Sequence, residues 1–293
     1  MKRADRSRLV AISVLLLLWS QLPQQAAADD ALELRFLVAA KLDTALLEAE
    51  KQSEPKQQIA VLKPAAAEAL RAMKANVFVQ DTLRTVEQAQ SDDPRQLAKQ
   101  WRNAVREARD ILRFEPLMEA PLPVGFPKPT PIGEIRVQQY PKYRLARTDM
   151  TLIEGRAFWT LFNHIKQREI AMTAPVEMSY IPNKDGKLDK SAMSFLYRNT
   201  EQGRLEVDGK VEVVDVPAQL AVSIGLRGDA TKEKVTDAKR RLEAWLQVHG
   251  DEYEPSGTIR VLGYNSPFVA DQKKLTEVQI PVRSKRPAAA NPR

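Results

Sequence analysis

The residues that could carry nucleophilic or metal chemistry are few in this chain. It contains two histidines, His164 and His249, and no cysteine among its 293 residues. Without cysteine there is no thiol nucleophile, no thiolate ligand for an iron–sulfur cluster and no side chain for thioether attachment of a cofactor. Neither a G-x-S-x-G nor an H-E-x-x-H motif occurs. We therefore expect a binding protein rather than an enzyme.

The two histidines stand in different surroundings. His249 precedes Gly250 at the end of a predicted helix over 231–248. A cation near the C-terminal dipole, followed by glycine, is a common way for a helix to end. His164 lies inside a predicted helix over 154–166. If imidazole holds a metal, His164 is the candidate ligand ahead of His249.

The helix predicted over 154–166 also carries a pattern that suits binding. Four apolar residues share one side of it and should face a sheet: Phe158, Leu161, Phe162 and Ile165. A neighbouring stripe holds Trp159 and Asn163, flanked by Arg156 and Lys166. This stripe would place an aromatic plane beside two positive charges. The alternative is a half-buried tryptophan among solvated charges.

The N-terminus has the pattern of an export signal. A basic start precedes the apolar run Leu9–Trp19, and the small residues Ala26–Ala28 follow. The apolar run is shorter than the roughly 20 residues of a membrane span. We expect residues 1–28 to be a cleaved signal peptide and the mature chain to be periplasmic or secreted, with an uncleaved anchor as the alternative.

The net charge of the chain is +7, but part of it lies in the first ten residues. Without them, 41 basic and 37 acidic residues leave a net charge of +4. We therefore expect no nucleic-acid partner.

Residues 29–114 show helical periodicity. The stripe of the first predicted helix comprises Leu34, Leu37, Val38, Leu42, Leu46 and Leu47. Pro55 ends it, Pro64 resembles the first turn of a new segment, and Ser91–Pro94 predicts a helix that runs to about Arg113. We expect a helical hairpin or small bundle. It either binds a protein partner through residues 31–114 or packs against the next domain.

Residues 115–132 are rich in proline and predict an extended linker. Beyond it, strand patterns dominate, and residues 284–293 form a polar tail that we expect to be disordered. Two strand–turn–strand units, each containing proline, are each followed by a helix and two further strands. This α+β pattern predicts a twofold ββαββ repeat: two antiparallel sheets flanked by two helices, with a ligand cleft where the halves meet.

Several segments of residues 133–283 resemble the SOUL/haem-binding protein family, in order along the chain. They are Ile170–Val176 (IAMTAPV), Tyr140–Ala146 (YPKYRLA), Gly155–Phe162 (GRAFWTLF), Gly263–Phe268 (GYNSPF) and Thr276–Val278 (TEV). The resemblance implies a distorted β-barrel and non-covalent binding of a tetrapyrrole, haem or another porphyrin, in an apolar cleft beside the first helix of the domain. We read Pro175, inside a predicted strand over 170–180, as marking a bulge where the barrel bends.

The resemblance and the helix pattern together predict the ligand contacts. They are Arg156, Trp159, Phe162, Asn163, Lys166 and Met172. Trp159 would stack on the macrocycle, and Arg156 and Lys166 would meet its propionates. Asn163 stands where family members often have a basic residue, and Met172 could instead fill the core. The function expected is that of an exported haem carrier, buffer or scavenger.

Two other functions fit the pattern. The layout also resembles the effector-binding domains of bacterial multidrug-responsive regulators, so the ligand could be another planar hydrophobic molecule. Alternatively, the domain is a scaffold and the N-terminal helices bind a protein partner.

Overall fold

The computed structural model describes residues 33–150 and 154–285. The predicted signal peptide, and all but the first two residues of the predicted tail, lie outside the described residues. The described residues form two compact units, one of 33–74 with 79–113 and one of 75–78 with 114–150 and 154–285. No helix in the described ranges has both the length and the apolar character needed to cross a bilayer.

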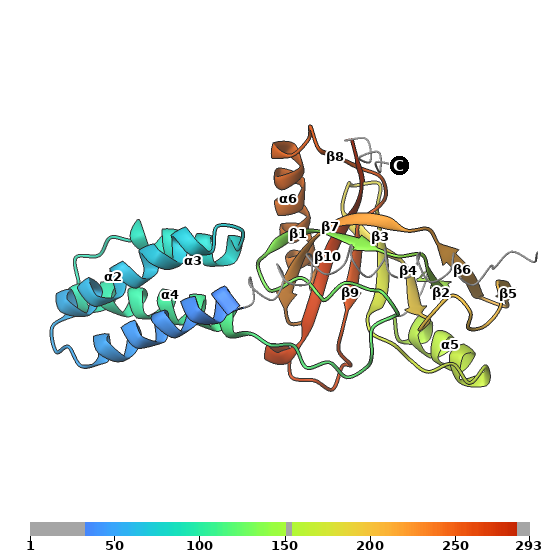
Figure 1. Ribbon diagram of the computed structural model, residues 1–293, viewed down its shortest axis with the longest axis horizontal. Coiled ribbons are helices and arrows are strands. Elements are labelled where there is room, and N and C mark those ends of the chain that lie inside the picture. The colour runs from blue at the N-terminus through green and yellow to red at the C-terminus, as the bar shows by residue number, and fades with distance from the viewer. Residues whose placement is uncertain (1–32, 151–153, 286–293) are drawn as a thin grey trace, which may run out of the picture. The chain divides into compact units, whose positions relative to one another are not determined.

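The first unit is helical. It contains a helix over 33–50, α2 (Pro55–Ala72), α3 (Val77–Glu87) except its first two residues, and α4 (Pro94–Arg113) (Figure 1). Pro64 does not begin a helix, as the sequence suggested, but lies inside α2. Buried side chains on both sides of Pro64 keep α2 continuous across it, since packing of an apolar face stabilises a helix more than propensity does. They are Ile59, Leu62, Ala66 and Ala69.

The predicted apolar stripe of the first helix is only partly buried. Val38, Leu42 and Leu46 are in the core, but Leu34, Leu37 and Leu47 are 41%, 54% and 60% exposed. The apolar side of this helix is therefore wider than the part of it that is buried in the core.

The second unit is an antiparallel sheet with two helices. The described strands are β1 (Ile135–Tyr140), β2 (Tyr143–Asp149), β3 (Val176–Pro182), β4 (Leu188–Leu196), β5 (Glu206–Asp208), β6 (Val211–Val216), β7 (Gln219–Arg227), β8 (Tyr253–Pro255), β9 (Arg260–Gly263) and β10 (Leu275–Ser284). Hydrogen bonds join them in the order β1-β7-β10-β9-β3-β4-β2-β6-β5, with β8 beside β10. The two predicted sheets are thus one continuous ladder.

The predicted strand over 170–180 is wrong in its first half. β3 begins only at Val176, directly after Pro175, whose peptide bond to Ala174 is cis. Proline has no N–H to give to a ladder, so the strand starts after it rather than bending through it. The register shift of this strand lies further on, between Ser179 and Tyr180.

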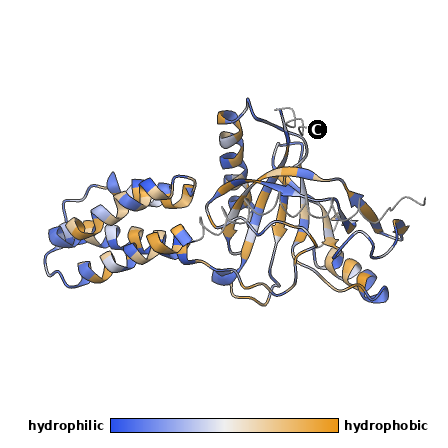
Figure 2. Cartoon of the chain, viewed as in Figure 1, coloured by the Kyte–Doolittle hydropathy of each residue, from blue (hydrophilic) through white to orange (hydrophobic). Residues whose placement is uncertain are grey.

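Helices α5 (Glu154–Gln167) and α6 (Lys232–Val248) cover different parts of the sheet. α5 contacts β2, β4 and β6, whereas α6 contacts β7 and β10 (Figure 1). Leu161 and Ile165 anchor α5 in one apolar cluster, and Leu242 and Leu246 anchor α6 in another. Figure 2 shows hydrophobic residues along both strands and helices, interrupted by hydrophilic ones.

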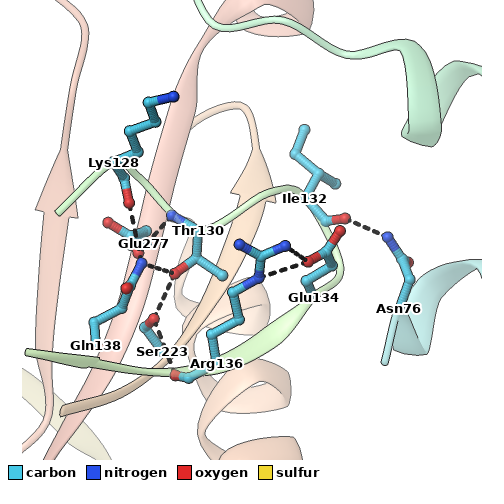
Figure 3. Close-up of polar contacts among 9 residues, drawn as sticks. All are labelled: Asn76, Lys128, Thr130, Ile132, Glu134, Arg136, Gln138, Ser223 and Glu277. Atoms are coloured by element: carbon cyan, nitrogen blue, oxygen red, sulfur yellow. Dashed lines mark hydrogen bonds and ion pairs between the residues drawn. The ribbon is translucent and has the colours of Figure 1, made fainter. Parts of the chain in front are cut away.

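The proline-rich segment, residues 115–132, is packed onto the sheet. The Thr130 backbone N–H donates to Oε1 of Glu277 on β10, and the Thr130 hydroxyl lies 2.5 Å from that of Ser223 on β7 (Figure 3). Nδ2 of Asn76 donates to the carbonyl of Ile132 at 2.8 Å. These bonds make the end of the segment part of the second unit.

A buried arginine ties four strands together. Arg260 on β9 donates to the Tyr143 hydroxyl at 2.6 Å, to Gln279 Oε1 at 2.8 Å and to Glu177 Oε2 at 3.2 Å. These partners lie on β2, β10 and β3. Burying this charge is tolerable because it is paired and hydrogen-bonded.

Candidate functional site

A cleft of about 740 Å³ opens beside α5. Its lining comes from the end of β2, the outward side of α5 and the turn that joins β5 to β6. The volume falls within the roughly 300–1,000 Å³ that small-molecule sites occupy. β2 and α5 belong to the first predicted ββαββ half and β6 to the second, so residues from both halves build the cleft.

The α5 wall is made by residues at helical spacing. Arg156, Trp159, Thr160 and Asn163 recur at intervals of three and four and share one side of the helix. Trp159 is 59% exposed. Its indole meets the rings of Phe158 and Phe162 edge-on, with centroids 5.8 and 5.5 Å away. The two phenylalanines therefore hold the indole while it keeps most of its surface open.

The opposite wall is a tight hairpin. β5 ends at Asp208 and β6 begins at Val211, which leaves Gly209 and Lys210 as a two-residue turn. Gly209 has a φ of 59°, a conformation that glycine adopts without a Cβ penalty. Val207 and Lys210 line the cleft, and Val207 is 75% exposed. This wall thus offers an apolar side chain and a cation.

The charges in the cleft are not all available to a ligand. Arg147 is paired with Glu212 on the neighbouring strand, at 2.7 Å between Nη2 and Oε2. Arg156, Lys210 and Asp149 also line the cleft, and none of the three makes an ion pair with the residues that the structure describes. The unpaired charge is therefore two cations against one carboxylate.

The structure separates the six predicted contacts. It places Arg156, Trp159 and Asn163 along the cleft. Phe162 and Met172 are partly buried and pack against the apolar cluster between α5 and the sheet. Lys166 is exposed and is not part of the cleft lining.

Sequence reasoning missed the β5–β6 wall, including Lys210 and Val207. The dipeptide Asp208-Gly209 is a recognised hairpin signal and could have indicated the turn. Its position across from α5 depends on the pairing of β6 with β2, which no local pattern reveals.

His164 lies outside the cleft lining and is buried. Its Nε2 is 3.0 Å from the Tyr197 hydroxyl, and its Nδ1 is 3.7 Å from Oδ2 of Asp208. Burial, with a smaller contribution from Arg168, lowers the pKa of His164. Nε2 is therefore engaged with Tyr197, whereas the buried Nδ1 has no hydrogen-bond partner among the described residues.

His249 ends α6, as the sequence predicted. Its ring stacks on Trp245 with centroids 3.8 Å apart, and its Nδ1 is 2.8 Å from the Trp245 carbonyl oxygen. Across the described ranges, no three metal-ligating side chains (His, Cys, Asp or Glu) gather into a cluster.

A family model described as SOUL heme-binding protein matches residues 130–281. This stretch is more than half of the chain and contains the whole sheet except the end of β10, together with α5 and α6. The chain therefore belongs to the SOUL haem-binding family. The resemblance seen in the sequence is confirmed.

A comparison with curated proteins finds no match. Among solved structures, the EcmrR C-terminal domain is 18% identical over 51% of this chain and 97% of its own, with a TM-score of 0.40. A protein described as a hydrolase from Listeria innocua is 13% identical over 53% of this chain and 94% of its own, with a TM-score of 0.40. SAV2435, bound to tetraphenylphosphonium, is 17% identical over 51% of this chain and 94% of its own, with a TM-score of 0.33. At these scores no conclusion about function follows.

Proposed function

We propose that this protein is an exported carrier, buffer or scavenger that binds haem or another tetrapyrrole without a covalent bond, in the cleft beside α5. Family membership supports a tetrapyrrole ligand. The observation that carries the choice of site is Trp159, a large aromatic ring that is 59% exposed within a concave surface. Exposed apolar surface of this kind, gathered in a cleft, is typical of ligand sites.

The residues present fit the macrocycle better than they fit its iron. Trp159 and Val207 offer apolar surface for the ring, and Arg156 and Lys210 offer charge for its carboxylates. Of the described lining residues, Met150 alone has a side chain among the usual axial ligands of haem iron. We therefore expect stacking and charge, rather than iron ligation, to supply the affinity.

The experiment is a titration of the purified mature chain with haemin and, separately, with protoporphyrin IX. We expect a shifted Soret band, affinities in the micromolar range and no more than about a threefold difference between the two ligands. Much tighter haemin binding would contradict the iron-independent site. Binding of neither would end the proposed function. Binding of unrelated planar hydrophobic dyes with equal affinity would favour the alternative of a broad hydrophobic sensor.

We also propose that the sheet is a twofold repeat that curves into a barrel. Exchanging β1 with β6, β2 with β7, β3 with β9 and β4 with β10 turns the order β1-β7-β10-β9-β3-β4-β2-β6 into its own reverse. A pseudo-twofold axis between β3 and β9 would have this effect. An experimental structure in which the two ββαββ units fail to superpose would contradict the repeat.

Export and a protein partner are further parts of the proposal. Cleavage after Ala28 predicts that the protein isolated from its host begins at Asp29, and an intact N-terminus would contradict it.

The exposed Leu34, Leu37 and Leu47 favour a protein-binding role for residues 31–114. Replacing these leucines with serine should then leave haemin binding unchanged and reduce partner recovery from the host, and unchanged recovery would count against the role.

A further inference from the structure

Little apolar burial holds β5 in place. It is three residues long, stands at one end of the strand order and pairs only with β6. Its central residue, Val207, is 75% exposed. β6 is held in the sheet by β2, but β5 has only its three residue pairs with β6, so a further interaction would help to fix it beside the cleft.

Arg168, directly after α5, provides that interaction. Its Nε donates to Glu206 Oε1 at 2.7 Å and its Nη2 donates to Asp208 Oδ2 at 2.8 Å. Residues two apart on a strand point to the same face, so one guanidinium reaches both carboxylates. The backbone around Arg168 is fixed as well. The N–H of Ile170 donates to the carbonyl oxygen of Ile165 at 2.9 Å, across the end of α5.

Lys210 follows closely on this anchored strand. Lys210 is two residues beyond Asp208 in the turn, on the cleft side. It forms no ion pair with any residue that the structure describes, and Arg156 on the α5 wall forms none either. Asp149 is the one unpaired carboxylate among the described lining residues. These three groups sum to a charge of +1, so the cleft favours an anionic ligand whose carboxylates can meet the two cations.

We propose that Lys210 selects tetrapyrroles that carry free carboxylates, together with Arg156, and that Arg168 is the positioning residue that holds Lys210 at the cleft. This inference rests on the proposed function and narrows its ligand class. The carboxylates of a porphyrin diacid meet the two cations while the ring lies against Trp159. A porphyrin whose carboxylates are esterified keeps the stacking surface and loses both charge contacts.

The test compares protoporphyrin IX with its dimethyl ester on the full mature chain, in one buffer with the same trace of non-ionic detergent. For the wild type we expect the diacid to bind roughly tenfold more tightly than the ester, since charge-assisted contacts exceed neutral ones. The preference should shrink as salt is raised. Lys210→Gln should reduce the diacid-to-ester ratio by roughly three- to tenfold and leave the affinity for the ester unchanged. Asp149→Asn should raise the ratio.

Arg168 is tested by the same ratio, which a loss of stability alone would not change. Arg168→Gln should lower the ratio as Lys210→Gln does, Arg168→Lys should restore part of it, and the double variant should be no worse than Lys210→Gln. Lys184→Gln is the matched control, because Lys184 is an exposed lysine on the β3–β4 turn, outside the cleft lining. It should have no effect.

The outcomes separate this inference from the proposed function. Equal binding of diacid and ester by the wild type would overturn the inference and leave tetrapyrrole binding intact. Binding of neither would remove the proposed function itself. If Lys184→Gln lowers the ratio as much as Lys210→Gln, the effect is overall charge and Lys210 has no special role. If Arg168→Gln weakens both ligands equally, Arg168 is not a positioning residue.

Discussion

The backbone N–H of Thr130 donates to Oε1 of Glu277 at 3.0 Å, and both residues are fully buried. The bond joins the end of the proline-rich segment to β10, and the two bonded residues are 147 positions apart in the sequence. Tyr264 donates its hydroxyl to the other carboxylate oxygen. A segment that the composition marks as a linker is thus held by a buried carboxylate of the sheet.

Gly225 should be intolerant of any side chain because the same segment crosses it. A Cβ at this position would lie 2.2 Å from the Thr130 carbonyl oxygen and 2.5 Å from that of Pro131, both backbone atoms. We expect Gly225→Ala to lower the free energy of unfolding by about 3 kcal/mol or more, measured by urea denaturation. Gly155→Ala is the control, since nothing lies within 4 Å of its Cβ position. Equal stability of the two variants would contradict the close packing of the segment.

Glu277 should make stability depend on pH in a defined direction. Burial raises the pKa of Glu277 above its ordinary value of 4.5, against the opposing effect of the hydrogen bonds from Thr130 and Tyr264. The folded state therefore holds this proton more tightly than the unfolded state. The resulting stability is present below about pH 4.5 and is lost as the pH rises through the folded pKa.

Glu277→Gln removes this titration and keeps an amide that can still accept from Thr130 and donate to Tyr264. The stability of the variant relative to wild type should rise with pH above 4.5, by at most about 1.4 kcal/mol per pH unit. Urea denaturation at several pH values between 4 and 8 measures this difference. A difference that stays constant, or falls as the pH rises, would contradict a raised pKa.

His164 should behave as a structural residue rather than as an iron ligand. His164→Ala removes the hydrogen bond to Tyr197 from a buried site and should cost about 1–3 kcal/mol of stability. Haemin affinity should change by less than about twofold, because the imidazole lies outside the cleft lining. A changed Soret band or a large loss of haemin affinity with unchanged protoporphyrin affinity would make His164 the ligand after all.

The predicted contacts that do line the cleft are those whose positions local periodicity determines. Arg156, Trp159 and Asn163 lie on one helix, where the intervals between them settle which side they share. Lys210 was missed because its position depends on a long-range strand pairing. β6 pairs with β2, with Glu212 opposite Arg147, 65 residues earlier in the chain, and this pairing places the β5–β6 turn beside the cleft. Lys166 lies outside the lining for a related reason. Its spacing puts it near the stripe, but the cleft ends before the last turn of α5.

The fold shows the same division. Family motifs and strand patterns predicted most elements, including β10 and both helices of the sheet domain. Prolines were harder to interpret, because their effect depends on tertiary packing. Pro64 lies inside α2, which stays continuous because side chains on both sides of it are buried. Pro175 precedes β3 instead of interrupting it.

Trp159 tests the central claim most directly, because that claim is an aromatic platform in the cleft beside α5. The measurement is the affinity for protoporphyrin IX, by absorbance titration, of the wild type, Trp159→Ala and Trp245→Ala. Trp245 is the matched control, a partly buried tryptophan on α6 that stacks on His249. We expect Trp159→Ala to weaken binding by roughly tenfold or more, as the loss of a stacking ring would, and Trp245→Ala to leave it unchanged. Unchanged affinity in Trp159→Ala, with the protein still folded, would place the ligand elsewhere and contradict the account.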